Sequence, residues 1–150
     1  MFLNDDSAPL GFSYQVYDGT FDMLPDFSSL QPIASGISNT ISTSVTTQTE
    51  TFGLVFSRKV TVPTAGKYTF ATTSDDGSKL YLDGNLVVNN DGLHGARTIQ
   101  NTVFLNSGEY DLRVEFFEKF GGQVLSVSIN WAQLQHNLFQ RMAFCDNGNC

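Results

Sequence analysis

The sequence has no long apolar segment and few charged side chains, and basic side chains are especially scarce. No stretch approaches the roughly 20 apolar residues that a transmembrane helix needs, so we expect no insertion into a membrane. Only 8 Lys and Arg side chains oppose 15 Asp and Glu, which gives a net charge of -7. Nucleic-acid surfaces need clustered basic side chains to contact phosphates. The composition therefore argues against nucleic acid and favours a cation-binding or extracellular protein.

Cysteine is scarce as well. The two cysteines, Cys145 and Cys150, lie close together near the C-terminal end. They could close a small disulfide around Asn147 and Gly148 in an oxidising compartment, or they could belong to a following cysteine-bearing module. In neither case would they staple a core, so the fold has to rest on the burial of apolar side chains.

The residues that are abundant favour strands and turns. Hydrophobic residues make up 41% of the chain and include 13 Phe, which is enough for one domain with a full core. Thr, Ser, Asn and Gly are frequent, whereas Lys, Glu and Ala are sparse. We expect a single domain over residues 1–150, with its core in about 11–131 and a C-terminal extension over 132–150.

Alternation of apolar and polar residues predicts a series of short strands. A first strand is expected over 11–19, followed by a long, partly packed loop over 20–32. Residues 36–51 fit a weak strand or an extended loop, and 131–140 fit a terminal helix or a return strand. The other predicted strands are 51–62, 68–73, 79–82, 86–88, 97–105, 110–116 and 124–131. Many short strands with frequent turns indicate an all-β fold, an antiparallel β-sandwich or barrel.

A central hairpin has two carboxylates at its mouth. The dipeptide Asp83-Gly84 joins the runs 79–82 and 86–88, and it is typical of a tight turn with positive φ angles. Asp75 and Asp76 lie just before this hairpin, where the preceding strand ends. Two adjacent negative charges in this position suggest a bound cation; the alternative is an ordinary acidic turn.

Several motifs in a fixed order resemble the PA-fourteen domain, a family named after a fragment of the anthrax protective antigen. They are Gly66–Phe70, Ser74–Gly84, Asn90–His94, Leu105–Gly108, Val114–Glu118 and Ile129–Trp131. The resemblance covers roughly residues 11 to 131. The family occurs in yeast flocculins and epithelial adhesins, in bacterial adhesins and as an insert in glycosidases, and it implies a β-sandwich.

The resemblance also implies a calcium site. In the lectin members of the family, the ion lies on two consecutive aspartates joined by a cis peptide, and two sugar hydroxyls complete its ligands. Asp75 and Asp76 match that pair. The second loop of the site corresponds to residues 118–123, where the backbone near Phe120 and Gly122 and the amide oxygen of Gln123 would add ligands. Gln123 departs from the flocculin pattern, which has Asn there.

Calcium chemistry fits such a set of groups. The ion takes about six to eight oxygen ligands at roughly 2.3–2.6 Å, with little demand on their angles. Two carboxylates, an amide oxygen and a few carbonyls leave positions open, and a vicinal diol fills two of them.

Other candidates in the two loops have structural alternatives. Phe120 could pack against a sugar ring or anchor its loop on the fold. Asp91 and His94 could bind a second cation or a ligand; alternatively, Asp91 caps its own turn and His94 bonds to the backbone. The predicted ligand-binding residues are Asp75, Asp76, Phe120, Gln123 and His94.

The sequence carries none of the common catalytic signatures, so we expect a binding protein and not an enzyme. Asp75 and Glu118 could form the carboxylate pair of a glycosidase, but an ion between them would keep both ionised. The leading hypothesis is a monomeric, calcium-dependent lectin module of a secreted or cell-surface adhesin that binds terminal sugars of glycans or polysaccharide. The alternatives are a structural or protein-interaction module of the same fold and an accessory domain of a glycoside hydrolase.

Overall fold

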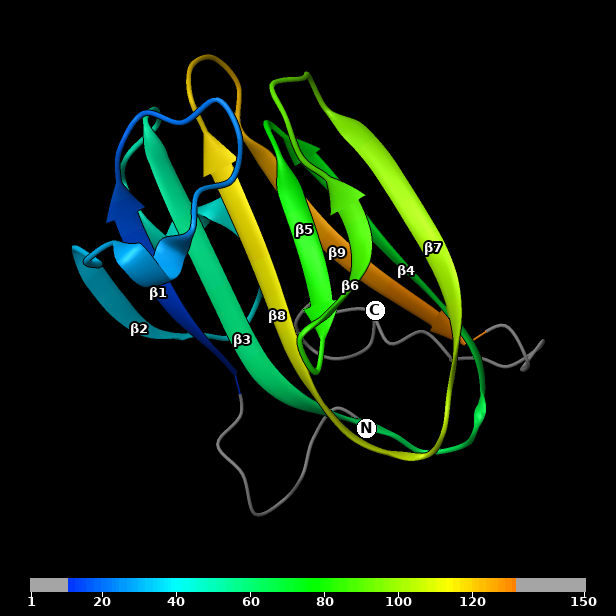
Figure 1. Ribbon diagram of the computed structural model, residues 1–150. Helices are drawn as coiled ribbons and strands as arrows, with labels where there is room; N and C mark the ends of the chain where they lie inside the picture. Colours follow the sequence, from blue (N-terminus) through cyan, green and yellow to red (C-terminus); the bar gives the residue numbers. More distant parts are fainter. Residues whose placement is uncertain (1–10, 132–150) are drawn as a thin grey trace.

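A computed structural model describes residues 11–131, which form two antiparallel β-sheets packed against each other (Figure 1). The strands are β1 (Phe12–Asp18), β2 (Ala34–Ser38), β3 (Phe52–Val62), β4 (Gly66–Asp75), β5 (Ser78–Leu82), β6 (Asn85–Asn90), β7 (Arg97–Leu105), β8 (Gly108–Glu118) and β9 (Val124–Trp131). Two short 3-10 helices, η1 (Phe27–Ser29) and η2 (Thr43–Val45), interrupt the loops. The predicted all-β sandwich is confirmed.

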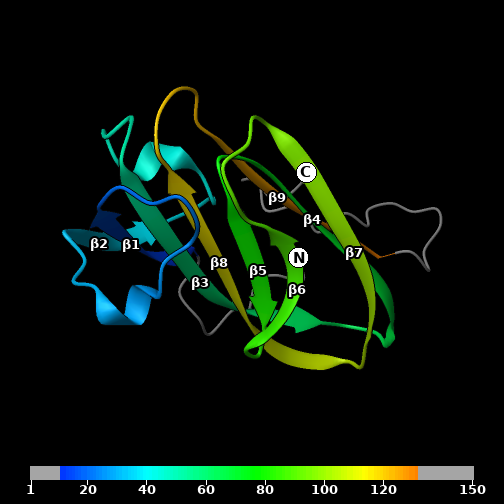
Figure 2. The same ribbon diagram turned by 45° about the horizontal axis from the view of Figure 1, so that its top comes forward.

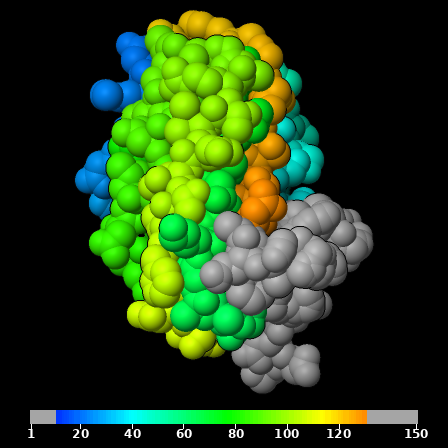
Figure 3. All heavy atoms as spheres, turned by 90° about the vertical axis from the view of Figure 1, so that its right-hand side faces the viewer, coloured from blue at the N-terminus to red at the C-terminus, as the bar shows by residue number. Residues whose placement is uncertain are grey.

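The large sheet has the strand order β2-β1-β3-β8-β5-β6, and the small sheet has the order β7-β4-β9. Figures 1 and 2 show the small sheet against the β5 and β6 side of the large one. The strand register brings the ends of β1, β6 and β8 together. Asp18 pairs with Phe52, which pairs with Glu118, and Ser78 pairs with both Asn90 and Phe116. The end of β4 joins them, because Asp75 lies beside Glu118. The loops that follow these strands therefore lie at one end of the molecule, at the top of Figure 3 for 91–96 and 119–123.

Period-two burial produces the core between the sheets. In β4 the inward residues Tyr68 and Phe70 are at most 1% exposed, while the alternate residues of the strand face outward. The main cluster also contains Phe52, Leu54, Phe56, Leu80, Leu112, Val114, Phe116 and Ile129. Burial of this aromatic and aliphatic surface is the main favourable contribution to folding.

A second, smaller apolar cluster lies on the outer face of the large sheet. Tyr17 and Val55 from the strands pack there with Phe27 of η1 and with Leu24 and Leu30. The predicted loop 20–32 thus folds back over part of this face and covers it, which confirms that it is partly packed.

Most predicted elements agree with the structure; one differs in its bounds, and the predicted hairpin turn is confirmed. The interval 36–51 contains the short strand β2, which begins earlier, at Ala34, and then η2. The turn between β5 and β6 has φ angles of 50° at Asp83 and 82° at Gly84, as the Asp-Gly pair predicts. The expectations for 132–140, for the side chain of Trp131 and for Cys145 and Cys150 lie outside the described residues.

Within residues 11–131, no helix is long and apolar enough to cross a membrane.

Candidate metal centre

Three carboxylates meet at the loop end of the two sheets. Asp75 is the last residue of β4, Asp76 follows it through a cis peptide bond, and Glu118 is the last residue of β8. One carboxylate oxygen from each lies within 4.8 Å of the others. The adjacent aspartates of the sequence are therefore joined by a third acid from the other sheet.

Glu118 is the most unusual of the three because it is fully buried. Its side chain is 0% exposed, and neither of its carboxylate oxygens has a hydrogen-bond partner among the described residues. Burial, with the nearby charges of Asp76 and Asp75, raises the pKa of Glu118 to about 8, and the nearby backbone N–H of Asp76 offsets only part of this rise. Burial and the charge of Asp76 also raise the pKa of Asp75. Glu118 and Asp75 thus resist ionisation in this cluster unless a positive charge joins them.

Asp76 ties two loops to the centre. Its Oδ1 accepts a hydrogen bond from the backbone N–H of His94 at 3.2 Å, and its Oδ2 accepts one from the backbone N–H of Lys119 at 2.9 Å. The loops 91–96 and 119–123 are therefore positioned by the same carboxylate that contributes to the cluster.

The first loop of the chain is attached to the other two. Asp22 forms an ion pair with Lys119 at 2.7 Å, and the backbone N–H of Leu24 donates to Asp91 at 2.9 Å. Three loops from different parts of the sequence thus surround the carboxylates.

Gln123, the predicted amide ligand, shares one feature with Glu118: a buried side-chain oxygen without a hydrogen-bond partner in the described part of the chain. Its Oε1 is buried and has no hydrogen-bond partner among the described residues. It directly precedes Val124, which pairs with Asp75 in the small sheet. Gly122 also passes close to the cluster, because a Cβ at this position would lie 3.8 Å from Oδ2 of Asp75.

Phe120 has an exposed side chain that a ligand could contact, whereas the ring nitrogens of His94 already have partners. The Phe120 side chain is 58% exposed, and Nζ of Lys119 lies 5.5 Å from its ring centroid. The ring nitrogens of His94 instead face the carbonyl oxygens of Gly95 at 2.8 Å and Asn90 at 2.9 Å. The structure favours the backbone-bonded interpretation of His94, while its N–H contact to Asp76 keeps it next to the centre.

The Asp91 carboxylate caps its own turn. Its Oδ1 accepts from the N–H of Gly92 at 2.8 Å as well as from Leu24. This supports the turn-capping interpretation over a second cation site.

Buried polar side chains hold the hairpin against β4 beneath the carboxylates. Asn90 is 0% exposed, and its amide donates to the backbone oxygen of Arg97 at 2.8 Å and to Thr72 and Ser74 at 3.3 Å. Arg97 in turn donates through Nε to Oδ1 of Asn90 at 2.8 Å. The start of the loop 91–96 is thereby anchored to both sheets.

Sequence reasoning placed Glu118 in the second loop and did not include it among the ligands. A signal was present: Leu112, Val114 and Phe116 alternate into the core, and Glu118 is the next residue in that phase. A carboxylate at an inward position of a strand needs a partner, because burying an unpaired charge is costly.

The donor set fits a hard cation. Carboxylate and amide oxygens are the groups that calcium prefers, and an oxygen-seeking ion would give the buried oxygens of Glu118 and Gln123 the partner that the described chain does not supply. The predicted residues Asp75, Asp76, Gly122 and Gln123 would hold such an ion, with Glu118 added to them.

Comparisons with known proteins support the resemblance. The family model of the PA14 domain, the PA-fourteen domain of the sequence analysis, matches residues 11–140. No curated protein sequence matches the chain.

Solved structures of low sequence identity share the fold. The PA14 domain of the MpAFP antifreeze protein is 20% identical with a TM-score of 0.70, covering 89% of this chain and 90% of that one. A PA14 sugar-binding domain from an RTX adhesin is 15% identical with a TM-score of 0.65, covering 91% and 99%. The A domain of epithelial adhesin 6 from Candida glabrata, in complex with Galb1-3GlcNAc, is 14% identical with a TM-score of 0.59, covering 90% and 85%.

Glycoside hydrolases also contain similar domains. A β-glucosidase from Kluyveromyces marxianus is 16% identical with a TM-score of 0.64, and the match covers 86% of this chain but only 17% of that enzyme.

Proposed function

Because the chain belongs to the PA14 domain family, we propose that it is a calcium-dependent carbohydrate-binding module of a secreted or cell-surface protein. Asp75, Asp76, Glu118 and Gln123 would hold the ion, with backbone oxygens near Phe120 and Gly122. When bound, calcium supplies positive charge and open ligand positions for two neighbouring hydroxyls of a sugar. Terminal sugars of a glycan or polysaccharide are the expected partners.

The burial of Glu118 is the observation that carries this proposal. An acidic cluster on a surface is common without an ion, but a carboxylate with no exposed surface and no hydrogen-bond partner in the described chain is not. Asp75 and Asp76 lie beside it within 4.8 Å, so a divalent cation there would offset the repulsion among the three acidic groups.

The loops around the cluster offer apolar surface to a ligand. Met23, Leu93 and Phe120 are 62%, 51% and 58% exposed. Each is next to a residue that ties its loop to the centre: Asp22 and Leu24 flank Met23, His94 follows Leu93, and Lys119 precedes Phe120. Sugar-binding sites typically combine exposed apolar side chains with polar groups. The apolar faces of the sugar ring pack on the side chains, while the sugar hydroxyls form hydrogen bonds with the polar groups.

A non-lectin role of the same fold is the alternative. The similarity to a domain inside a β-glucosidase favours an accessory module, in which the carboxylate cluster would stabilise the loops through an ion without binding sugar. Affinity for sugar separates the two roles, because calcium binding is expected in both.

A glycan array probed in millimolar calcium and again in excess chelator tests the proposal. Binding to glycans that share a terminal vicinal diol, lost in chelator, is the expected result. Asp75→Asn and Asp76→Asn should abolish both calcium and sugar binding. Glu109→Gln, which removes an exposed carboxylate near the start of β8, far along that strand from Glu118, should leave both unchanged.

Phe120→Ser extends the test to ligand preference. We expect the calcium affinity to stay within about twofold, because an exposed ring contributes no oxygen, while the ranking of glycans changes. Calcium binding without any glycan binding would favour the accessory role, and full glycan binding by Asp76→Asn in chelator would disprove the ion-dependent mechanism.

A further inference from the structure

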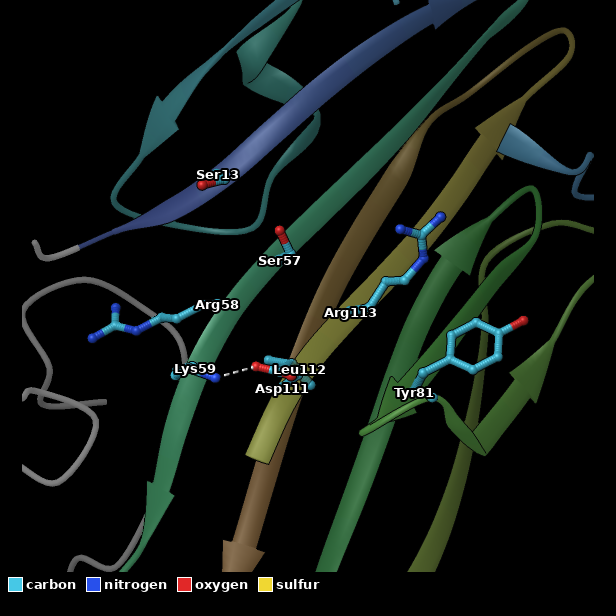
Figure 4. A pocket seen from close by; sticks show the side chains of 9 residues that line it. Ser13, Ser57, Arg58, Lys59, Tyr81, Asp111, Leu112 and Arg113 are labelled. Atoms are coloured by element: carbon cyan, nitrogen blue, oxygen red, sulfur yellow. Dashed lines mark hydrogen bonds and ion pairs between the residues drawn. The ribbon is translucent and has the colours of Figure 1, made fainter. Parts of the chain in front are cut away.

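A hollow of about 370 Å³ lies on the outer face of the large sheet, beside the part that loop 20–32 covers (Figure 4). Four of its lining residues stand in one row across neighbouring strands. Ser13 pairs with Ser57, Ser57 pairs with Arg113, and Arg113 pairs with Tyr81. Neighbouring strands are about 4.8 Å apart, so the row spans about 14 Å. The groove, as we call this hollow, is long enough for two or three sugar units.

The shape of the groove follows from side-chain size along this row. Ser13 and Ser57 are small and form the low part, whereas the longer side chains of Arg113 and Tyr81 stand at the other end of the row (Figure 4). Lys59 lines the groove from the next pair along β3, where its ammonium meets Asp111.

The groove offers several hydrogen-bond donors, and its lining carboxylate, Asp111, is paired with Lys59. Arg113 uses Nε and Nη2 on Oε2 of Glu115, at 2.9 Å and 2.8 Å, and its remaining guanidinium N–H groups stay available. Glu115 is mostly buried, so it fixes the orientation of this fork. Within residues 11–131, the hydroxyls of Ser57 and Tyr81 have no hydrogen-bond partner among the described contacts.

The Lys59 pair adds a second available donor. Its ammonium lies 2.8 Å from Asp111, and the two side chains are 66% and 68% exposed. Such exposed pairs contribute little and are readily exchanged for another anion. Burial, with the charge of Glu115, raises the pKa of Tyr81, so its hydroxyl keeps its proton at neutral pH and can donate.

We propose that the groove is a second carbohydrate-binding site and that it takes an acidic sugar, whose carboxylate lies on the free edge of the Arg113 guanidinium and whose ring packs beside Tyr81. A guanidinium fork matches a carboxylate in two parallel hydrogen bonds. The hydroxyls of Ser13, Ser57 and Tyr81 match sugar hydroxyls, which both donate and accept.

An acidic peptide fits the same charges less well. The strands β1, β3, β8 and β5 are all interior strands of the sheet, so their backbone groups already pair with neighbours. An extended peptide would find no free strand edge to pair with and would lose the backbone bonds that give such peptides affinity.

The groove does not depend on the metal centre. Arg113 precedes Glu118 by five residues on β8, which is about 17 Å along a strand, and the odd spacing puts their side chains on opposite faces of the sheet. The proposal takes only the class of ligand from the proposed function. Binding in the groove should persist in chelator, where the metal centre cannot hold calcium.

An NMR titration of the ¹⁵N-labelled chain in chelator tests the groove. The probes are trigalacturonate, the neutral galactose trimer of the same linkage, and a hexaglutamate peptide. Trigalacturonate should shift the amide signals of residues 13, 57, 81 and 113 and bind at least about tenfold more tightly than the neutral trimer.

Arg113→Lys, which keeps a charge opposite Glu115, should weaken binding about tenfold. Tyr81→Phe should weaken it by a smaller factor.

Lys67→Gln is the matched control, because it removes an exposed positive charge from β4 in the other sheet. Equal loss in Lys67→Gln and Arg113→Lys would reduce the effect to unspecific charge attraction and overturn the proposal, as would shifts confined to other residues. Tighter binding of hexaglutamate than of trigalacturonate would assign the groove to acidic peptides. Asp76→Asn should leave trigalacturonate binding intact, so a failure of the calcium site and a failure of the groove give different results.

Discussion

At the scale of single residues, Glu118 determines how the centre behaves without an ion. Its pKa is about 8 in the folded chain and 4.5 when the group is unperturbed. Between these values the folded chain binds more protons than the unfolded chain, so stability falls as the pH rises. In chelator, urea denaturation should give a free energy of unfolding lower at pH 8.5 than at pH 5, with Glu118 contributing on the order of 4 kcal/mol of the difference.

The variant Glu118→Gln isolates this contribution. It keeps the shape of the side chain and removes the titration, so most of the pH-dependent loss should disappear while other carboxylates still titrate. An unchanged pH dependence in Glu118→Gln would mean that the buried carboxylate does not control the stability of the centre.

At the scale of elements, the strand ends and loops have to approach closely for the carboxylates to meet. Gly77, between Asp76 and β5, shows the constraint. A Cβ there would lie 2.6 Å from the ring of Phe117, 2.8 Å from Oδ1 of Asp91 and 2.8 Å from the backbone nitrogen of Gly92. Backbone and a buried ring cannot yield cheaply at these distances, so the loop 91–96 would have to move.

Gly77→Ala should therefore lower the free energy of unfolding by about 1–3 kcal/mol, measured by urea denaturation. It should also weaken calcium binding, because the loop that contacts Asp76 shifts. Gly95→Ala is the control: it lies in the same loop, and a Cβ at that position has no neighbour within 4 Å. Equal stability of the two variants would refute the packing argument.

Sequence patterns predicted the elements because the forces behind them are local. The alternation of apolar and polar residues predicted the strands, and Asp83-Gly84 predicted the hairpin turn, because both signals depend only on neighbouring residues. The joining of Glu118 to Asp75 and Asp76 depends on which strands lie side by side and in which register, and neighbouring residues do not encode that. The groove was missed for the same reason: Ser13, Ser57, Arg113 and Tyr81 are scattered along the sequence and meet only through the strand order.

At the scale of the whole molecule, the proposed ion site would couple ion binding to folding. Asp75 ends β4 of the small sheet and Asp76 follows it, Glu118 ends β8 of the large sheet, and Asp76 also holds two loops. An ion on all three carboxylates would link both sheets in the folded state and find no such site in the unfolded chain. Binding energy therefore appears as stability.

Calcium should raise the melting temperature of the chain. At a free concentration of about 100 times the dissociation constant, binding adds about 2.7 kcal/mol to the free energy of unfolding. For a domain of this size that corresponds to a shift of about 5–12 °C in thermal unfolding followed by circular dichroism. Magnesium should give a much smaller shift, because it demands a tighter octahedral set of ligands. Asp76→Asn should abolish the calcium shift and Glu109→Gln should retain it. An equal shift in both variants would place the stabilising ion elsewhere in the chain.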